Sequence, residues 1–265
     1  MSDAKNVLKV QGMSMDFGGL RAIDEVDLNV QEGEVVALIG PNGAGKTTFF
    51  NCITGIYTPT EGDVLITSGD EAEKRINGVK PDMVTKLGMA RTFQNIRLFP
   101  SMTVIENVMI GCHGRAKAGI LGAIFRNKKT RDEEFAILEK SYRLLKVIGL
   151  EEWANELACN LPYGAQRKLE IARALATDPF LLLLDEPAAG MNPQETVELK
   201  HLILEIRDKF NISVLLIEHD MKMVMSMSDR IFVVEYGRLI ATGSPQEISE
   251  NPDVIRAYLG EEVIG

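Results

Sequence analysis

The stretch EVVALIGPNGAGKTT, Glu34–Thr48, joins a run of apolar residues to a glycine-rich loop. A continuous apolar run that ends in glycine is typical of a strand buried on both faces, as in a parallel sheet. The loop after it matches the P-loop pattern: glycine, four residues, glycine, lysine, then serine or threonine. Such glycines let consecutive backbone N–H groups point at phosphate oxygens, and the next helix directs its positive end at the same charge. The stretch therefore predicts a nucleotide-phosphate site on a strand–loop–helix unit.

Each position of the loop has a chemical role in this pattern. Gly40 and Gly45 let the backbone curl, Lys46 adds a cation at the β and γ phosphates, and the Thr47 hydroxyl is suited to Mg²⁺. The alternative is a glycine-rich turn whose lysine has no binding role. The P-loop pattern by itself occurs by chance in roughly one chain of this length in a hundred. We therefore expect contacts to nucleotide phosphates from most of the loop: Gly40, Asn42, Gly43, Ala44, Gly45, Lys46, Thr47 and Thr48.

A second apolar run, FLLLLDEP at Phe180–Pro187, ends in two carboxylates. Asp185 would emerge at the carboxyl end of a buried strand, where open α/β sheets bind ligands, and there it can hold Mg²⁺. Glu186, one residue further, is a candidate general base for an attacking water. Judged alone, the run favours an acidic turn at a strand end, but the P-loop upstream favours the metal and base roles.

The rest of the chain alternates between strand and helix patterns. SVLLIEHD, Ser213–Asp220, predicts a third buried strand, and IFVVEYGRLIATG, Ile231–Gly243, predicts a hairpin. Residues 8–34 alternate with a two-residue period, which indicates strands of an antiparallel sheet. The runs NPQE, Asn192–Glu195, and SPQE, Ser244–Glu247, have the residues of capped helix starts. Strands that alternate with helices indicate an α/β core, and the absence of a buried-strand run between Thr92 and Leu175 indicates a separate helical lobe.

Composition limits the function classes. The 265 residues carry a net charge of −9, which argues against a nucleic-acid partner because such proteins present a basic face. The three cysteines have no paired spacing, which favours a reducing compartment over a disulfide framework. The N-terminus lacks an apolar signal core, and no apolar run approaches the roughly 20 residues of a membrane helix. We therefore expect a cytosolic protein whose membrane role would come through a partner.

Taken in order, GPNGAGKTT, RTFQ, LPYGAQR, LLLLDEP and LLIEHD resemble the motifs of the ATP-binding subunit of an ABC transporter. The resemblance implies that Phe17 stacks on adenine; the less favoured alternative is an edge-strand aromatic that belongs to the core. It implies that Gln94 senses Mg²⁺ and water and couples to a membrane partner, and that His219 reaches the γ phosphate. The α/β fold would then be a RecA-like P-loop NTPase with an N-terminal antiparallel β subdomain and an inserted helical subdomain.

LPYGAQR, at residues 161–167, resembles the family's signature motif. In that family the motif closes over the nucleotide of a second ATPase subunit, so Tyr163, Gly164 and Ala165 are expected to contact ATP in trans. The chain departs from the common Leu-Ser-Gly-Gly-Gln form, because Pro162 replaces the serine, Tyr163 a glycine and Ala165 the glutamine. The serine hydroxyl contact to phosphate is therefore missing.

More narrowly, FGGLRAIDEVDL, IEHDMKMVM and NPDVIRAYLGEE resemble the branched-chain amino acid uptake group. ATPases of urea or amide uptake and of lipopolysaccharide export are the closest rivals. An ABC-type ATPase that acts on nucleic acid is an alternative from another class, but it would carry a long coiled coil between Gln94 and the signature. The expected partners are a second ATPase subunit, identical or homologous, the permease subunits and, indirectly, a substrate-binding protein. The expected location is the inner face of the cell membrane.

The resemblance also implies how the chain divides. We expect a catalytic core with its antiparallel subdomain at residues 1–93 and 176–243, a helical signature subdomain at 94–175 and a helical tail at 244–265. The insertion at 112–131 is basic with an apolar centre. It predicts either a solvated loop or a contact with lipid headgroups or the membrane subunit.

Overall fold

The P-loop strand lies inside a six-stranded sheet of a computed structural model that describes residues 5–69, 71–113 and 128–259. The chain divides into two units. The first takes in the described residues of Met1–Arg91 and Phe180–Gly265, and the second is Thr92–Pro179.

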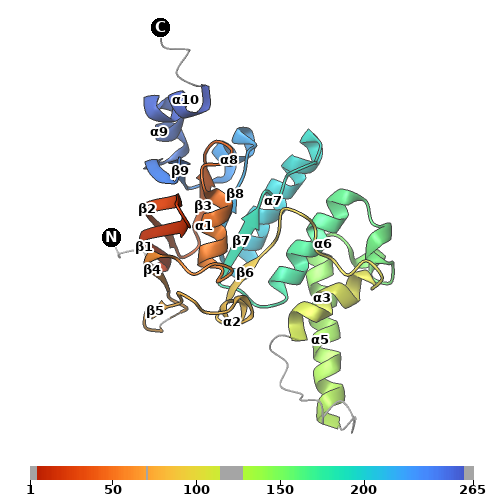
Figure 1. The fold of residues 1–265 in the computed structure, drawn as a ribbon. Helices are drawn as coiled ribbons and strands as arrows, with labels where there is room; N and C mark the ends of the chain where they lie inside the picture. The colour runs from red at the N-terminus through yellow and green to blue at the C-terminus, as the bar shows by residue number, and fades with distance from the viewer. Residues whose placement is uncertain (1–4, 70, 114–127, 260–265) are drawn as a thin grey trace. The chain divides into compact units, whose positions relative to one another are not determined.

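The six-stranded sheet has the order β10-β9-β3-β8-β7-β6 (Figure 1). All neighbours are parallel except β10, which pairs antiparallel with β9. Every residue of β3, β7 and β8 is buried, which explains their continuous apolar runs. The strands are β3 (Val35–Ile39), β6 (Met89–Arg91), β7 (Leu181–Asp185), β8 (Ser213–Ile217), β9 (Arg230–Glu235) and β10 (Arg238–Gly243). This is the α/β core that the sequence predicts.

A four-stranded antiparallel sheet has the order β2-β1-β4-β5. Its strands are β1 (Asn6–Phe17), β2 (Leu20–Gln31), β4 (Glu61–Ile66) and β5 (Lys74–Arg75). The alternation at residues 8–34 predicts the first two strands. The shorter strands β4, β5 and β6 have no comparable run of alternating apolar and polar residues. Apolar residues of both sheets and of α1 (Lys46–Ile53) form one core cluster.

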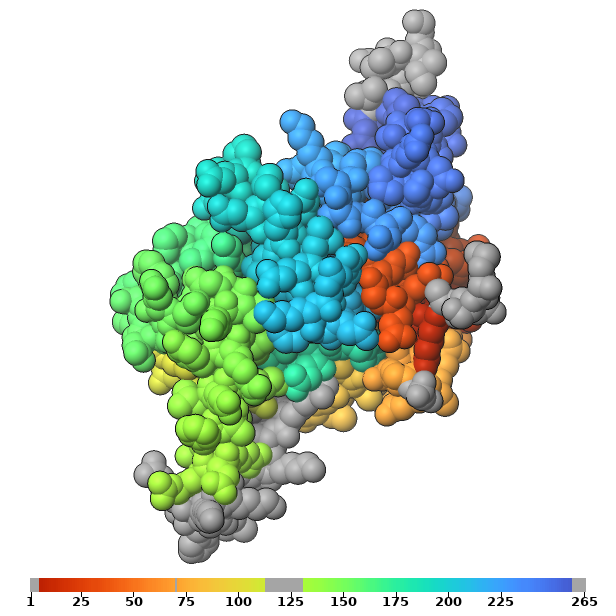
Figure 2. All heavy atoms as spheres, turned by 180° about the vertical axis from the view of Figure 1, so that it is seen from behind, coloured from red at the N-terminus to blue at the C-terminus, as the bar shows by residue number. Residues whose placement is uncertain are grey.

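Helices flank these sheets in the first unit. They are α2 (Pro81–Lys86), α7 (Pro193–Phe210), α8 (Met221–Met227), α9 (Pro245–Glu250) and α10 (Pro252–Leu259). Both expected capped starts are confirmed, because Asn192 and Ser244 each form a capping box. Figure 2 shows α7 and the chain that follows it at the surface of this unit, in cyan to blue.

The described residues of the second unit are mainly helical, with α3 (Val104–His113), α5 (Lys128–Val147), α6 (Tyr163–Leu175) and two short 3₁₀ turns at Glu151–Trp153 and Ala158–Asn160. Residues 114–127, most of the basic insertion, lie outside the described residues. Within the described ranges, none of the helices has the length and apolar character that a bilayer crossing needs.

Candidate active site

A cavity of about 580 Å³ lies beside the P-loop in the first unit. Its volume is in the range of small-molecule sites in proteins. Ten of the residues expected from the sequence line it: Phe17, Asn42, Gly43, Ala44, Gly45, Lys46, Thr47, Thr48, Glu186 and His219. The wall also contains five residues that are not among the expected site residues: Leu20, Arg21, Ala22, Tyr236 and Gly237. Residues from five separate parts of the chain therefore meet at one cavity.

Two loop glycines are required by close packing as well as by backbone conformation. Gly40 has φ 153° and Gly45 has φ 98°, both in the region that favours glycine. A Cβ at Gly40 would lie 2.0 Å from the Val234 carbonyl oxygen, and one at Gly45 would lie 2.6 Å from that of Ala22. Helix α1 begins directly after Gly45 without a side-chain cap, so its first N–H groups are presented to the cavity without an intrahelical acceptor.

Lys46 is held inside the loop that it belongs to. Its Nζ donates hydrogen bonds to the carbonyls of Gly40 at 2.7 Å and Pro41 at 2.9 Å, and only 6% of the residue is exposed. Burial lowers the pKa of Lys46, and the charges of Glu186 and Asp185 oppose that shift. Both carboxylates are therefore close enough to act on the ammonium group, which is the arrangement expected at a phosphate and metal site.

Glu186 and His219 lie in direct contact. The distance from His219 Nε2 to Glu186 Oε1 is 3.0 Å, and the two residues follow the adjacent parallel strands β7 and β8. Glu186 has φ 49°, a conformation uncommon for a non-glycine residue, and its N–H donates to the Ile217 carbonyl at 2.9 Å. Strained backbone of this kind is typical of functional sites, where the surrounding structure maintains it.

Glu218, which is not among the expected site residues, fixes the loop that carries His219. Its buried carboxylate accepts the N–H groups of Ala188 at 2.7 Å, His219 at 2.8 Å and Asp220 at 3.2 Å. The sequence signal for this role is an acidic residue at the end of an apolar run, directly before His219 and Asp220. Glu218 thus joins the loop after β7 to the loop after β8.

Asp185 forms a buried ion pair that the sequence did not predict. Arg91 Nη2 lies 2.7 Å from Asp185 Oδ2, and Arg91 Nη1 also donates to Asn51 Oδ1 at 2.8 Å and Thr54 Oγ1 at 3.1 Å. The partner comes from β6, the strand that pairs with β7. Arg91 therefore fixes the orientation of the Asp185 carboxylate.

The residues present fit Mg²⁺ better than a transition metal. The Asp185 carboxylate and the Thr47 hydroxyl are hard oxygen donors, which Mg²⁺ prefers. Within the described part of the chain there is no group of three or more His, Cys, Asp or Glu side chains that could hold a metal ion. A site of this kind depends on substrate phosphates and water for its other ligands, as Mg²⁺ sites commonly do.

Phe17 lies at the end of β1 with 41% of its surface exposed. Its ring contacts Tyr57 edge to face, with the centroids 5.2 Å apart and the planes at 80°. A partly exposed aromatic ring that lines a cavity is suited to stacking. Phe17 is therefore a wall of the cavity rather than a core residue.

The expected signature lies in the second unit. Helix α6 begins at Tyr163 after Pro162, which provides no side-chain cap, so the first N–H groups of the helix lack a capping acceptor. Gly164 is buried and Ala165 is half-buried. Gln94 belongs to the same unit, so the cavity of the first unit contains neither Gln94 nor the signature residues.

Arg167 connects the signature helix to the segment around Gln94. Its guanidinium donates to the carbonyls of Phe93 at 2.7 Å and Gln94 at 2.8 Å, and to the Tyr163 hydroxyl at 3.1 Å. A 3.1 Å ion pair with Glu170 completes the set, and neither side chain is more than 2% exposed. Tyr163, at a position where the family form has glycine, thus contributes its hydroxyl to this network.

Two family sequence models match the chain. One described as "ABC transporter" matches residues 23–189, and one described as "Branched-chain amino acid ATP-binding cassette transporter" matches residues 238–264. The chain is 50% identical over 255 residues to the high-affinity branched-chain amino acid transport ATP-binding protein LivG of Salmonella typhimurium. That alignment covers 96% of this chain and 98% of LivG.

Solved structures with the same fold include a nucleotide-free ATP-binding cassette from an ABC transporter. It is 32% identical with a TM-score of 0.82, covering 97% of this chain and 100% of the cassette. A dimeric cassette in a post-hydrolysis state, bound to ADP and Pi, is 26% identical with a TM-score of 0.73. That match covers 90% of this chain and 98% of the cassette.

Proposed function

Because the chain belongs to the ABC transporter family as an ATP-hydrolysing subunit, we propose that it powers an importer of branched-chain amino acids. The observation that carries this proposal is the similarity to a branched-chain transport ATPase along nearly the whole chain, with the match at residues 238–264 outside the general ATPase region. Urea, amide and lipopolysaccharide transport have no comparable support.

The P-loop cavity binds the nucleotide in this proposal. The phosphates lie against the first N–H groups of α1 and the Lys46 ammonium, while the adenine stacks on Phe17. The full set of phosphate-loop contacts is Gly40, Asn42, Gly43, Ala44, Gly45, Lys46, Thr47 and Thr48. The glycines bring the backbone close enough to the phosphates for this binding.

Thr47, Asp185 and Gln94 would hold Mg²⁺, with Arg91 fixing the Asp185 carboxylate. When bound, Mg²⁺ supplies neutralising charge to the phosphates. The hard oxygen donors of Thr47 and Asp185 support this assignment.

Glu186 acts as the general base in the proposed reaction. Its carboxylate takes a proton from water as the water attacks the γ phosphate, and the products are ADP and phosphate. The 3.0 Å contact with His219 holds the Glu186 Oε1 atom in place, and His219 is exposed enough at 42% of its side chain to reach the γ phosphate. The buried Glu218 keeps the His219 backbone in position.

A second ATPase subunit, identical or homologous, completes the proposed site. The uncapped start of α6, with Tyr163, Gly164 and Ala165, faces the nucleotide held by the partner, since free helix N–H groups favour phosphate. The dimeric relative with ADP and Pi supports this arrangement. ATP closes the dimer and hydrolysis reopens it, and permease subunits at the inner membrane face convert that cycle into alternating access.

The cargo is tested with the complete transporter, because an ATPase subunit does not contact it. The protein would be purified with its native permease subunits in lipid, and ATP hydrolysis measured with candidate binding proteins. We expect stimulation by a binding protein loaded with leucine, isoleucine or valine. Stimulation by a urea-loaded or amide-loaded protein alone would overturn the branched-chain assignment and leave the ATPase assignment intact.

A further inference from the structure

Tyr236 is an aromatic residue in the cavity wall that no motif explains. It lies in the turn between β9 and β10 and is 87% exposed. Its φ of 48° is in the left-handed region, which is an outlier for a bulky residue. Within the described residues its side chain has no hydrogen bond, ion pair or ring contact. The phenol ring therefore makes no polar or ring contact that stabilises the fold. Asparagine or glycine would adopt the same backbone conformation with less strain.

The turn that carries Tyr236 is fixed against the phosphate loop. The Gly237 N–H donates to the Ala44 carbonyl at 3.1 Å, and the Gly237 carbonyl accepts the Asp24 N–H at 2.9 Å. A Cβ at Gly237 would lie 2.7 Å from the Ala22 carbonyl oxygen, so the turn packs directly on β2. Tyr236 is thereby held at the cavity by backbone contacts on two sides.

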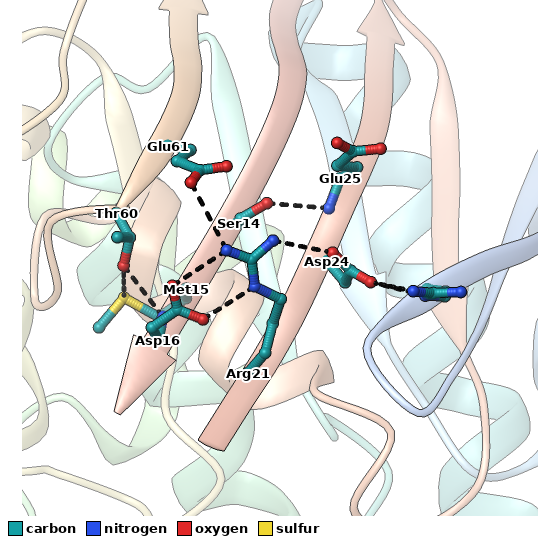
Figure 3. A network of polar contacts seen from close by, with 9 residues as sticks. Ser14, Met15, Asp16, Arg21, Asp24, Glu25, Thr60 and Glu61 are labelled. Atoms are coloured by element: carbon teal, nitrogen blue, oxygen red, sulfur yellow. Dashed lines mark hydrogen bonds and ion pairs between the residues drawn. The ribbon is translucent and has the colours of Figure 1, made fainter. Parts of the chain in front are cut away.

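The β1–β2 hairpin that carries Phe17 is tied to the same point. Figure 3 shows Arg21 between Asp16, Glu61 and Asp24. Arg21 donates two hydrogen bonds to Asp16, at 2.9 and 3.1 Å, and one to Asp24 at 3.1 Å.

Asp24 also accepts Arg238 Nε at 2.6 Å, from the residue two places after Tyr236. Arg21 first, and Arg238 second, hold the pKa of Asp24 below its ordinary value, so this carboxylate stays charged and bound to both. Asp24 thus connects the hairpin of Phe17 with the turn of Tyr236.

We propose that Tyr236 forms a second aromatic contact to the nucleotide base beside Phe17, and that Asp24 is the positioning residue that sets the spacing of the two rings. The proposal rests on the proposed nucleotide site. Its basis is that both rings line one cavity with the phosphate loop, from two elements joined by Asp24. Base–aromatic stacking contributes enough that its loss weakens binding by about tenfold.

The test compares ATP with inorganic tripolyphosphate, a probe that has the phosphates and no base. Equilibrium binding of both probes is measured for the unchanged protein, Tyr236→Ala, Tyr236→Phe and Tyr236→Asn. We expect Tyr236→Ala and Tyr236→Asn to weaken ATP by about tenfold and leave tripolyphosphate unchanged, and Tyr236→Phe to retain the affinity for ATP. The asparagine variant is the matched control for backbone strain, because asparagine tolerates positive φ.

Three results would overturn the proposal. The first is unchanged ATP affinity in Tyr236→Ala. The second is an equal loss for ATP and tripolyphosphate, which would mean that the turn only supports the phosphate loop. The third is weaker ATP-dependent dimerisation with unchanged ATP binding, which would make Tyr236 a subunit contact. Failure of the unchanged protein to bind ATP would overturn the nucleotide site itself, and the proposal with it.

Asp24 is tested by a double-mutant cycle with the same two probes. Asp24→Asn should weaken the binding of ATP and leave that of tripolyphosphate unchanged. In the Tyr236→Ala background it should cause no further loss of ATP affinity, because Asp24 then has no second ring to position. Additive losses of ATP affinity would show that Asp24 acts independently of Tyr236 and would overturn its positioning role.

Discussion

Replacement of Arg167 by methionine tests the buried network of the second unit. Arg167 is 0% exposed and donates to Phe93, Gln94 and Glu170, so its loss leaves two carbonyls without this donor and a buried carboxylate without its nearest cation. Removal of one partner of a buried ion pair costs about 3–5 kcal/mol. We expect Arg167→Met to lower the free energy of unfolding of this unit by about that amount.

Urea unfolding followed by tryptophan fluorescence measures the effect. The chain has a single tryptophan, Trp153, and it lies in the second unit, so the signal reports that unit. With a slope of about 2 kcal/mol per molar urea, a loss of about 4 kcal/mol moves the midpoint down by about 2 M.

Arg167→Met/Glu170→Gln is the matched control. It removes the uncompensated charge and keeps an acceptor for the Arg97 N–H, which donates to Glu170 at 3.2 Å. We expect this double variant to be more stable than Arg167→Met alone. A midpoint shift below about 0.5 M for the single variant, or no recovery in the double variant, would refute the reasoning.

The same network predicts a dependence on pH. Burial raises the pKa of Glu170, opposed by the Arg97 N–H and then by the charges of Arg167 and Arg173. A carboxyl with a folded pKa above its unfolded value favours folding as pH falls, and loss of Arg167 raises that pKa further. The destabilisation by Arg167→Met should therefore be largest above the folded pKa of Glu170 and shrink as pH falls through it.

Three further predictions concern the proposed ATPase cycle. Glu186→Gln should bind ATP, lose about 10²–10⁴-fold in turnover and accumulate a closed dimer on size-exclusion chromatography; near-normal hydrolysis would contradict its role as base. Pro162→Ser, in the Glu186→Gln background, should lower the ATP concentration needed for dimerisation in sedimentation experiments, because the hydroxyl adds a phosphate contact; an unmoved ATP dependence would make Pro162 a helix cap only. ATP affinity should fall as pH rises through the lowered pKa of Lys46, because the ammonium group then loses its charge. Lys46→Arg should make ATP affinity less dependent on pH, because arginine keeps its charge. A pH-independent ATP affinity in the unchanged protein would contradict a charged Lys46 at the phosphates.

The residues of the candidate active site could be predicted from the sequence where they lie in one continuous run. The P-loop, the DEP end of β7 and the EHD end of β8 each combine a buried strand with the residue that follows it. Because the carboxyl ends of parallel strands meet at one edge of the sheet, the meeting of Lys46, Glu186 and His219 follows from strand patterns alone. The short strands β4, β5 and β6 had no such signal, since two to six residues with mixed polarity carry too little periodicity.

The residues that hold the site in place were decided only by the tertiary structure. Arg91 and Asp185 are 94 positions apart, and Arg238 and Asp24 are 214 apart. A charged side chain has the same identity on the surface and in a buried pair, so the sequence does not say which carboxylate it will meet. That choice comes from strand pairing and packing, which bring distant segments together: the chain's local patterns determined the chemistry, and long-range contacts determined its geometry.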